Sequence, residues 1–307
     1  GVILFKEMKN IIKKNENILT LAYLMRQFFY KHFFTDKEFI KRKFKKKLGR
    51  EVNLTNPVKF NDKLQWLKLN WRDPLAVKLA DKYAVREFVK KRIGEKYLNK
   101  LYGVYDSVDD ISLNLLPEQF VLKGTHGSGF NIICKDKDNL DWKKSLKKMN
   151  RWMKINYFWH TREWVYKDIK PRIIAEKYIK TSDGSRLKDY KFFCFNGKAK
   201  LLFVAKNRGI ATTFDFYDMD WNWLDLKNHY PNSNKKTKKP KKFYKMVKLD
   251  EKLSEGFPHV RVDFYYQNDK IYFGELTFFH FSGFEPFEPE FYDEKMGEWL
   301  KLPTNNY

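Results

Sequence analysis

The sequence lacks any apolar run approaching the ~18 residues that a membrane-spanning helix needs, so it predicts no transmembrane segment. It has no recognisable secretory signal, because the apolar start GVILFKEMKN is short and contains an acidic residue. The 307 residues include 2 cysteines, Cys134 and Cys194, which excludes a disulfide framework or a cysteine-rich metal site and favours a reducing cytoplasm. The first residue is glycine rather than methionine, which indicates an excised domain or a cloning remnant.

Acidic residues are also scarce: 38 acidic side chains stand against 62 basic ones, for a net charge of +24. Aromatic residues reach 18%, which argues against disorder although 33% of residues are charged. A balance this basic predicts acidic partners such as nucleic acid, an anionic membrane surface, nucleotide phosphates or an acidic polymer. The sequence contains no RNP-type motif, finger spacing or helix-turn-helix signature, so we expect no nucleic acid.

Much of the positive charge lies in two blocks, residues 41–50 and 235–248. Each is interpreted as a solvated face or mobile loop, or as a surface that attracts anions. The second contains Pro240 and follows the turn-rich YPNSN, which predicts a flexible insertion. Residues 3–34 have apolar positions at helical spacing with basic residues between them, which predicts one or two amphipathic helices. These helices would pack on the body, lie on a membrane surface or join another domain.

The remaining pattern predicts an α+β fold. A helix is expected in 56–70, beginning near Asn61 or Asp62, and a second helical region in 73–94. Later segments alternate as strands joined by turns such as NGK and QNDK, which predicts a largely antiparallel C-terminal half. Strands do not alternate with helices along the chain, which excludes a doubly wound fold.

The stretch KGTHGSGF, residues 123–130, follows the apolar strand QFVL and precedes the alternating FNIICKD. This order predicts a hairpin around a glycine-rich loop whose backbone N–H groups are exposed, with the Lys123 ammonium beside it. A phosphate suits such a loop, although a tight turn with a surface lysine has the same pattern. The lysine precedes the glycines, so the loop is neither a P-loop nor a Rossmann fingerprint.

Two further strands carry paired charges. IIAEKYI, residues 173–179, has Glu176 near its end and could form a hinge against a flat base, or be an ordinary strand. In KDYKFFCFNGK, residues 188–198, Asp189 and Lys191 lie on the same side of a strand whose partner carries Lys206 and Arg208. Cross-strand charge pairs on an exposed face would explain the second pattern equally well.

The segment VRVDFYYQNDKIYFGELTF, residues 260–278, gives the most specific signal. Antiparallel pairing around the QNDK turn would bring Asp263 beside Glu275. Two adjacent carboxylates are costly without a cation, and Mg²⁺ with phosphate oxygens would stabilise them. Arg261 is placed to meet a transferring phosphoryl group. The alternative is a hairpin with two solvated acids.

The order of DKYAVREF, VLKGTHGSG, IIAEKYI, DYKFF…NGK and RVD…GELTF resembles the ATP-grasp superfamily, and most closely the TupA-like ATP-grasp family found among bacterial cell-surface polysaccharide genes. The resemblance covers about residues 55–303. It implies an ATP-grasp fold, in which the nucleotide lies between two antiparallel sheets. It divides the chain into a basic helical segment (1–54), an N-terminal subdomain (55–117), a central subdomain with the glycine-rich loop (118–182) and a C-terminal subdomain with the metal site (183–307).

The resemblance also implies roles for individual residues. The residues implied to bind ATP are Arg86, Lys123, Gly127, Ser128, Gly129, Glu176, Lys177, Ile179 and Asp183. Those implied to act on the phosphates are Arg261 and Lys191, and those implied to bind Mg²⁺ are Asp263 and Glu275. The metal motif departs from the family's usual Glu-x-Asn, because Thr277 replaces the asparagine. His126 and His280 are expected closest to the site, where a histidine is more often structural than catalytic.

The implied activity is a cytoplasmic carboxylate–amine ligase that forms an amide through an acyl phosphate with ATP and Mg²⁺. Its expected partners are an acidic carbohydrate, such as a uronic acid of a capsular polysaccharide, and a small amine. Peripheral association with the inner face of the membrane would run through the basic N-terminal helices. Two alternatives remain: a glycosyltransferase using the Asp-x-Asp of DMD, residues 218–220, and a non-catalytic anion-binding module.

Overall fold

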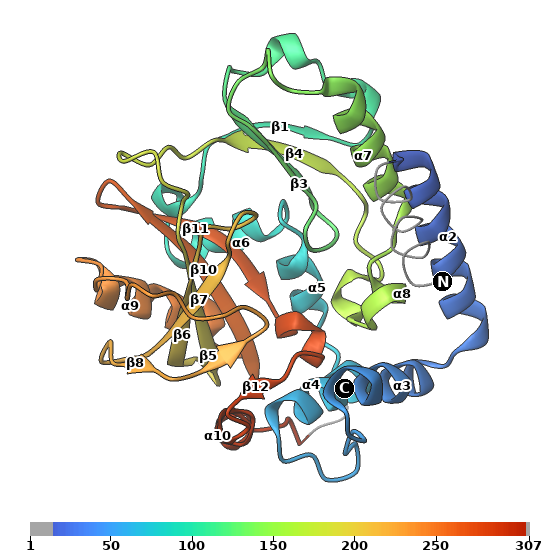
Figure 1. Cartoon of the computed structure of the whole chain (residues 1–307), viewed down its shortest axis with the longest axis vertical. Helices are drawn as coiled ribbons and strands as arrows, with labels where there is room; N and C mark the ends of the chain where they lie inside the picture. Colours follow the sequence, from blue (N-terminus) through green and yellow to red (C-terminus); the bar gives the residue numbers. More distant parts are fainter. Residues whose placement is uncertain (1–14, 305–307) are drawn as a thin grey trace. The chain divides into compact units, whose positions relative to one another are not determined.

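A computed structural model of the chain describes residues 15–304 (Figure 1). The chain forms two compact units and passes between them more than once. Within the described residues, unit 1 comprises 15–39, Asp81–Tyr83 and Lys100–Tyr178, and unit 2 comprises Ile40–Ala80, Ala84–Asn99 and 179–304. The four consecutive segments expected from the sequence are a finer division that these two units do not test.

Unit 1 contains a four-stranded antiparallel sheet in the order β1-β4-β2-β3. The strands are β1 (Leu101–Tyr105), β2 (Phe120–Gly124), β3 (Asn131–Cys134) and β4 (Ile173–Lys177). Its helices are α2 (Glu16–Phe33), α7 (Trp142–Lys154) and α8 (Phe158–Thr161), with 3₁₀ turns η2 (Val108–Asp110), η3 (Leu113–Leu115) and η4 (Trp164–Tyr166). The register pairs Lys123 with Asn131, which confirms the hairpin around the glycine-rich loop.

Helix α7 covers this sheet because its sequence is amphipathic. Met149 and Trp152 are buried together with Phe120 and Leu122 of β2, while Lys143, Lys144 and Lys147 are exposed. The Asp141 side chain accepts a hydrogen bond from the Lys144 N–H at 2.8 Å and caps the helix.

Unit 2 is built on a six-stranded antiparallel sheet in the order β11-β10-β5-β6-β7-β8. Its strands are β5 (Asp189–Phe195), β6 (Lys198–Lys206), β7 (Thr213–Asp218), β8 (Trp223–Leu224), β10 (His259–Gln267) and β11 (Lys270–Thr277), and β9 (Lys227–Asn228) pairs with β12 (Phe287–Glu288). The β5–β6 turn has Asn196 and Gly197 at φ 49° and 75°, and the β10–β11 turn has Asn268 and Asp269 at 51° and 57°. These left-handed turn residues set the register beside each turn, and a bulge in each hairpin then shifts the pairing by one residue, at Phe193–Cys194 and at Asp263–Phe264.

The helices and 3₁₀ turns of unit 2 are α4 (Phe60–Asn70), α5 (Pro74–Ala80), α6 (Val85–Arg92), η1 (Glu95–Tyr97), α9 (Phe243–Ser254), η5 (His280–Gly283) and α10 (Phe291–Trp299). Helix α3 (Asp36–Leu48) includes residues assigned to both units and carries most of the first basic block. No helix within residues 15–304 is both long and apolar enough to cross a bilayer.

Three helical expectations need revision. The region 73–94 is not one helix, because the Asp81 carboxylate accepts the Tyr83 N–H at 2.8 Å and forms a turn between α5 and α6. The second basic block is only partly an irregular insertion, since residues 243–248 begin α9 and bury Phe243 and Met246. Of the amphipathic N-terminal segment, residues 16–33 form α2, and residues 3–14 lie outside the described part of the chain.

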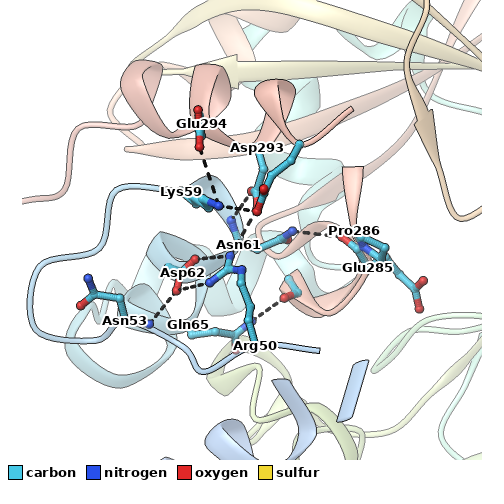
Figure 2. Close-up of polar contacts among 12 residues, drawn as sticks. Arg50, Asn53, Lys59, Asn61, Asp62, Gln65, Glu285, Pro286, Asp293 and Glu294 are labelled. Carbon is cyan, nitrogen blue, oxygen red and sulfur yellow. Dashed lines mark hydrogen bonds and ion pairs between the residues drawn. The ribbon is translucent and has the colours of Figure 1, made fainter. Parts of the chain in front are cut away.

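The first turn of α4 is held by a network of buried charges (Figure 2). Lys59 precedes the helix and supplies no side-chain cap. Instead Asp293 of α10 accepts the Asn61 N–H at 2.8 Å. The Asp62 carboxylate accepts two hydrogen bonds from Arg50, at 3.0 and 2.5 Å. Helix α4 is therefore capped by a residue more than 200 positions away in the sequence.

Candidate functional site

The strands β5, β10 and β11, together with Arg208 in the turn after β6 rather than on that strand, bring six charged side chains together in unit 2. The register places Asp263 opposite both Glu275 on β11 and Lys191 on β5, which confirms that the two acids are neighbours. We call this set the charged cluster; its members are Asp189, Lys191, Arg208, Arg261, Asp263 and Glu275.

Arg261 is the centre of the charged cluster. Its Nε donates to Asp263 Oδ1 at 2.7 Å, and its Nη2 donates to Asp263 Oδ2 at 2.8 Å. The same Nη2 lies 3.4 Å from Glu275 Oε1 and 3.1 Å from Thr277 Oγ1. One planar guanidinium therefore orients both carboxylates and the threonine that replaces the family's asparagine.

Lys191 and Arg208 complete the charged cluster on the β5 side. The Lys191 ammonium pairs with Asp263 and lies 3.8 Å from Asp189 Oδ2. Arg208 Nη1 donates to the same Asp189 oxygen at 2.6 Å, and Asp189 raises the pKa of Arg208. Lys206, the other basic residue expected on the partner strand, pairs instead with Asp215 at 2.6 Å.

The charged cluster is electrically balanced, and four of its six members are buried, while Glu275 is partly exposed and Arg208 is exposed. Its three cations face three carboxylates, and Asp189 and Asp263 are each 2% exposed. Removing charges from water costs several kcal/mol per ion, so buried pairs of this kind contribute little to net stability. Such an arrangement favours a functional role, because apolar residues would fill the same volume at lower cost.

His280 holds Arg261 from the opposite side. Arg261 Nη1 donates to His280 Nδ1 at 2.8 Å, and His280 Nε2 lies 2.8 Å from Asn228 Oδ1. Arginine can only donate, so Nδ1 is the acceptor and the ring is neutral with its proton on Nε2. Burial and the nearby Arg261 charge lower the pKa of His280 well below its usual value. Both ring nitrogens are occupied, so His280 positions Arg261 and is not placed to remove a proton.

The backbone that carries His280 is strained. Phe281, Ser282 and Gly283 have φ values of 43°, 59° and 64°, which non-glycine residues rarely adopt in succession. Helix α4 stabilises this turn: Gln65 Nε2 donates to the Ser282 and Gly283 carbonyls at 3.0 and 2.8 Å, and Lys68 Nζ donates to the Ser282 carbonyl at 2.6 Å.

The charged cluster has the donor chemistry of a magnesium site, although no group of three or more His, Cys, Asp or Glu residues suited to a metal occurs within residues 15–304. Carboxylate oxygens on adjacent strands are ligands that Mg²⁺ accepts when phosphate oxygens and water complete its coordination. Both Asp263 oxygens accept hydrogen bonds from Arg261. Asp263 and Glu275 would hold the ion if Arg261 or Lys191 turned from Asp263 toward a phosphate and freed a carboxylate oxygen.

Unit 1 contains the second group of candidate residues. Lys123 Nζ donates to Glu176 Oε2 at 2.6 Å across the paired strands β2 and β4. Glu176 is 7% exposed, so it does not lie on a solvent face. The ion pair orients the Lys123 ammonium at the edge of the glycine-rich loop.

The glycine-rich loop is anchored at its base and open at its tip. Lys82 Nζ donates to the Gly127 carbonyl at 2.6 Å, and His126 Nε2 lies 2.8 Å from the Trp152 carbonyl. A Cβ at Gly127 would lie 2.8 Å from the Phe130 ring, and Gly129 has φ 76°, so both positions require glycine. Ser128 and Gly129 are exposed. Burial lowers the pKa of His126.

The remaining candidates make other contacts. Arg86 on α6 donates from Nη2 to the Asn99 carbonyl at 2.7 Å. The Lys177 N–H donates to the Lys100 carbonyl at 2.9 Å, and Ile179 is half-buried in the chain segment that begins unit 2. Asp183 is exposed and its Oδ1 accepts the Ser185 N–H at 3.0 Å in a turn.

The Asp-x-Asp of residues 218–220 is engaged in its own turn. Asp218 Oδ1 accepts the Asp220 and Asn222 N–H groups at 2.9 and 2.8 Å, and Oδ2 accepts the Asn222 side-chain amide at 2.9 Å. The carboxylate stabilises the loop after β7, which gives this motif a structural explanation.

Sequence reasoning missed Asn228, which fixes the His280 tautomer. Asn228 lies on the two-residue strand β9 and donates from Nδ2 to the Pro286 carbonyl at 2.9 Å. Nothing in the local pattern marks it, because its partners are more than 50 residues away.

Two antiparallel sheets, one with a lysine before a glycine-rich loop and one with paired acids beside an arginine, define an ATP-grasp fold. The chain belongs to the TupA-like ATP-grasp family, whose model matches residues 62–301. Among curated proteins, none matches the chain.

Several solved structures are similar to the chain. The D-alanine–D-alanine ligase from Bacillus anthracis complexed with ATP is 15% identical, with 66% of this chain and 54% of that chain covered and a TM-score of 0.38. The L-amino acid ligase from Bacillus licheniformis is 13% identical, with 73% and 49% covered and a TM-score of 0.42. The chain spans about half the length of these two proteins.

Proposed function

We propose that the chain is an ATP-dependent carboxylate–amine ligase. Family membership supports this class of reaction, and the observation that carries it is Arg261 bound to both Asp263 and Glu275 beside Lys191. Two buried cations next to paired carboxylates, Lys191 and Arg261, suit the neutralisation of phosphate charge. Phosphoryl transfer needs that neutralisation and alignment more than covalent participation by the protein.

In the proposed reaction the substrate carboxylate attacks the γ-phosphorus of ATP, and ADP leaves with the pair of electrons of the broken P–O bond. The amine then attacks the carbon of the acyl phosphate, loses a proton, and displaces inorganic phosphate to leave an amide. Arg261 and Lys191 would stabilise charge on the phosphoryl oxygens, and Lys123 with the glycine-rich loop would bind ATP phosphates. Mg²⁺, when bound by Asp263 and Glu275, would neutralise further phosphate charge.

We further propose that the carboxylate substrate is an acidic carbohydrate, such as a uronic acid of a bacterial cell-surface polysaccharide. A cavity of about 410 Å³ in unit 2 supports this class of substrate. Five basic residues and two acidic ones are among those that line it: Arg186, Lys188, Lys238, Lys239 and Lys241, with Asp183 and Asp269. Tyr190 and Tyr266 supply aromatic surface in the same cavity. The net charge of +24 would also attract a polyanionic acceptor.

The experiment is ADP release by purified protein with Mg·ATP, a panel of amines and a panel of uronates. We expect release that depends on both co-substrates and falls by at least about 10²-fold in Asp263→Asn and Glu275→Gln, the order of loss seen when one electrostatic group is removed from an active site. Asp220→Asn is the matched control, because Asp220 is exposed and lies outside the charged cluster.

Two outcomes would contradict the proposal. One is retention of ADP release in both charged-cluster variants. The other is loss of activity in Asp220→Asn together with thermal stabilisation by Mg·UDP-sugar but not by Mg·ATP, which would favour a sugar-nucleotide transferase.

A further inference from the structure

Helix α2 presents its apolar side chains to solvent. Six large apolar residues recur at spacings of three or four positions or are adjacent, and so lie along one side of the helix. Each is between 41% and 64% exposed. We call this set the apolar stripe; its members are Ile18, Leu21, Met25, Phe28, Phe29 and Phe33.

The opposite side of α2 faces unit 1 through polar contacts and through ring contacts of Tyr23 and Tyr30. Glu16 pairs with Arg151 of α7, and Gln27 Oε1 accepts the Asn156 N–H at 2.8 Å. Arg162 donates to the Tyr30 carbonyl at 2.6 Å. No residue of α2 is fully buried, and its most exposed large apolar residues lie on the side away from these contacts, whereas an ordinary surface helix buries its apolar side. The apolar stripe is therefore not explained by packing within unit 1.

Basic side chains border the apolar stripe. A groove of about 440 Å³ between α2 and α7 is lined by Leu21 and Leu24 on one side and by Lys147 and Lys154 on the other. A second groove, of about 510 Å³ at the N-terminal end of α2, is lined by Lys143, Lys144 and Lys147. These α7 lysines are exposed.

We propose that the α2–α7 surface of unit 1 binds the surface of an anionic lipid bilayer. The 18 residues of α2 give a helix about 27 Å long, which would lie in the plane of the interface with the apolar stripe among the acyl chains. The α7 lysines would contact lipid phosphates, each adding attraction near an anionic surface. An apolar side bordered by lysines is the composition of helices that lie on membranes.

Charge complementarity favours an anionic lipid surface over two other partners for the apolar stripe, a second copy of the chain and residues 1–14. A second copy of a chain with net charge +24 would bring lysines against lysines at the same grooves. Residues 1–14 include seven large apolar residues but also four lysines against one glutamate, so they too would add positive charge beside the α7 lysines. Only an anionic surface complements both the apolar stripe and the basic border.

Flotation with vesicles tests the proposal with the full chain. We expect binding to vesicles of phosphatidylcholine with 30% phosphatidylglycerol, and little binding to pure phosphatidylcholine. Met25→Glu/Phe28→Glu and Lys147→Glu/Lys154→Glu should each lower the partition coefficient about tenfold or more. Leu115→Glu is the matched control, because Leu115 is 88% exposed on η3 of the same unit and lies outside α2.

A fluorophore at position 25 reports what covers the apolar stripe: lipid, a second copy of the chain, or another part of the same chain. Cys134 and Cys194 are both buried, so a Met25→Cys variant can be labelled selectively with an environment-sensitive dye. We expect emission typical of water for the free protein and a blue shift on addition of anionic vesicles. A blue-shifted emission without vesicles would overturn the proposal. A shift that depends on protein concentration would mean that a second copy covers the apolar stripe. A shift independent of concentration would mean that another part of the same chain covers it. Equal binding to both vesicle types, or unaltered binding of the Met25/Phe28 variant, would also overturn it.

Discussion

At the residue scale, the most informative contact is the hydrogen bond between Arg261 and His280. The guanidinium is 7% exposed, so each of its N–H groups needs an acceptor within the protein. His280 accepts one of them and is itself held by Asn228. Orientation of Arg261 therefore depends on a residue that would not touch ATP in the proposed reaction.

This dependence predicts that His280→Ala slows the proposed ligation by about 10²-fold in kcat, with a smaller change in the KM for ATP. Removal of the imidazole leaves a buried N–H of Arg261 without an acceptor, which should also lower the free energy of unfolding by about 1–3 kcal/mol. His280→Asn retains an acceptor near the position of Nδ1 and should recover most of the rate. Steady-state kinetics and urea unfolding provide the measurements.

His259→Asn serves as the matched control. His259 is a buried histidine on β10 whose Nδ1 lies 2.9 Å from the Cys194 carbonyl, and the structure gives it no hydrogen bond to Arg261. The variant should lose stability but retain kcat. Equal losses of kcat in His259→Asn and His280→Ala would show that general destabilisation, not the orientation of Arg261, accounts for the effect.

The charged cluster could be anticipated in part from the sequence. Strand alternation and the QNDK turn predict that Asp263 and Glu275 belong to one hairpin, but their direct pairing depends on a bulge beside Asp263 that shifts the register by one residue. The contacts of His280 and Asn228 could not be anticipated, because they join an irregular turn to a two-residue strand. Neither segment has a periodicity from which a partner can be inferred.

At the element scale, the helix pair α4–α10 depends on a close approach of two backbones. A Cβ at Gly297 would meet the Val58 carbonyl oxygen well inside contact distance and would lie 3.0 Å from Lys59 C and Phe60 N. Backbone atoms cannot move aside as the end of a flexible side chain can. The spacing of the two helices is therefore set by the absence of a side chain at position 297.

The Gly297→Ala variant separates the effect of helix propensity on stability from the effect of packing. Alanine in place of glycine inside a helix should stabilise it by about 1 kcal/mol. Here we expect the opposite sign, a loss of about 1–3 kcal/mol, because the added methyl group overpacks the contact. Denaturant unfolding measures the change. Lys295→Ala on the exposed side of α10 should remain within about 0.5 kcal/mol of the parent, and a stabilised Gly297→Ala would contradict the packing argument.

The cap of α4 by Asp293 predicts a pH dependence. Burial raises the pKa of Asp293 to about 6 from a reference value of 3.8, against the opposing effects of the Asn61 N–H and Arg50. Between these two pH values the folded state binds the proton more tightly than the unfolded state does. The contribution of Asp293 to stability is therefore largest below about pH 4 and is lost as the pH rises through 6.

Asp293→Asn mimics the neutral acid and should remove this dependence. The shift corresponds to about 3 kcal/mol, so the variant should gain about that much relative to the parent between pH 4 and pH 8. Urea unfolding of both proteins at the two pH values gives the comparison. If the two proteins differed in free energy of unfolding by the same amount at both pH values, the pKa of Asp293 in the folded state would lie near its reference value.

Sequence rules located most elements but not their interruptions. The helical pattern continues through 73–94, yet the Asp81 turn breaks it, and Arg172 binds the same carboxylate at 2.7 Å. A side chain that is bound by a distant residue can thus override local propensity. Helix α4 shows the same effect. Its start near Asn61 or Asp62 could be read from the sequence, but the side chain that caps it, Asp293 of α10, could not.

At the scale of the whole molecule, the dominant property is one-sided charge. With 62 basic and 38 acidic residues, most long-range electrostatic interactions at neutral pH are repulsive. Many of the lysines lie on exposed helix faces, as in α3, where Lys41, Lys46 and Lys47 are exposed. Folding brings these charges closer than they are in the unfolded chain, so the native state bears most of the repulsion.

Salt should therefore stabilise the protein. Between 10 and 150 mM NaCl the Debye length falls from about 30 to about 8 Å, which screens repulsion between distant charges more than it weakens ion pairs in contact. We expect the thermal midpoint to rise over this range. Lys46→Gln should raise the midpoint at 10 mM and reduce the response to salt, because it removes one like charge without touching the core. A midpoint that falls with salt would mean that exposed ion pairs such as Lys45–Glu51, rather than the net charge, govern the electrostatic free energy of folding.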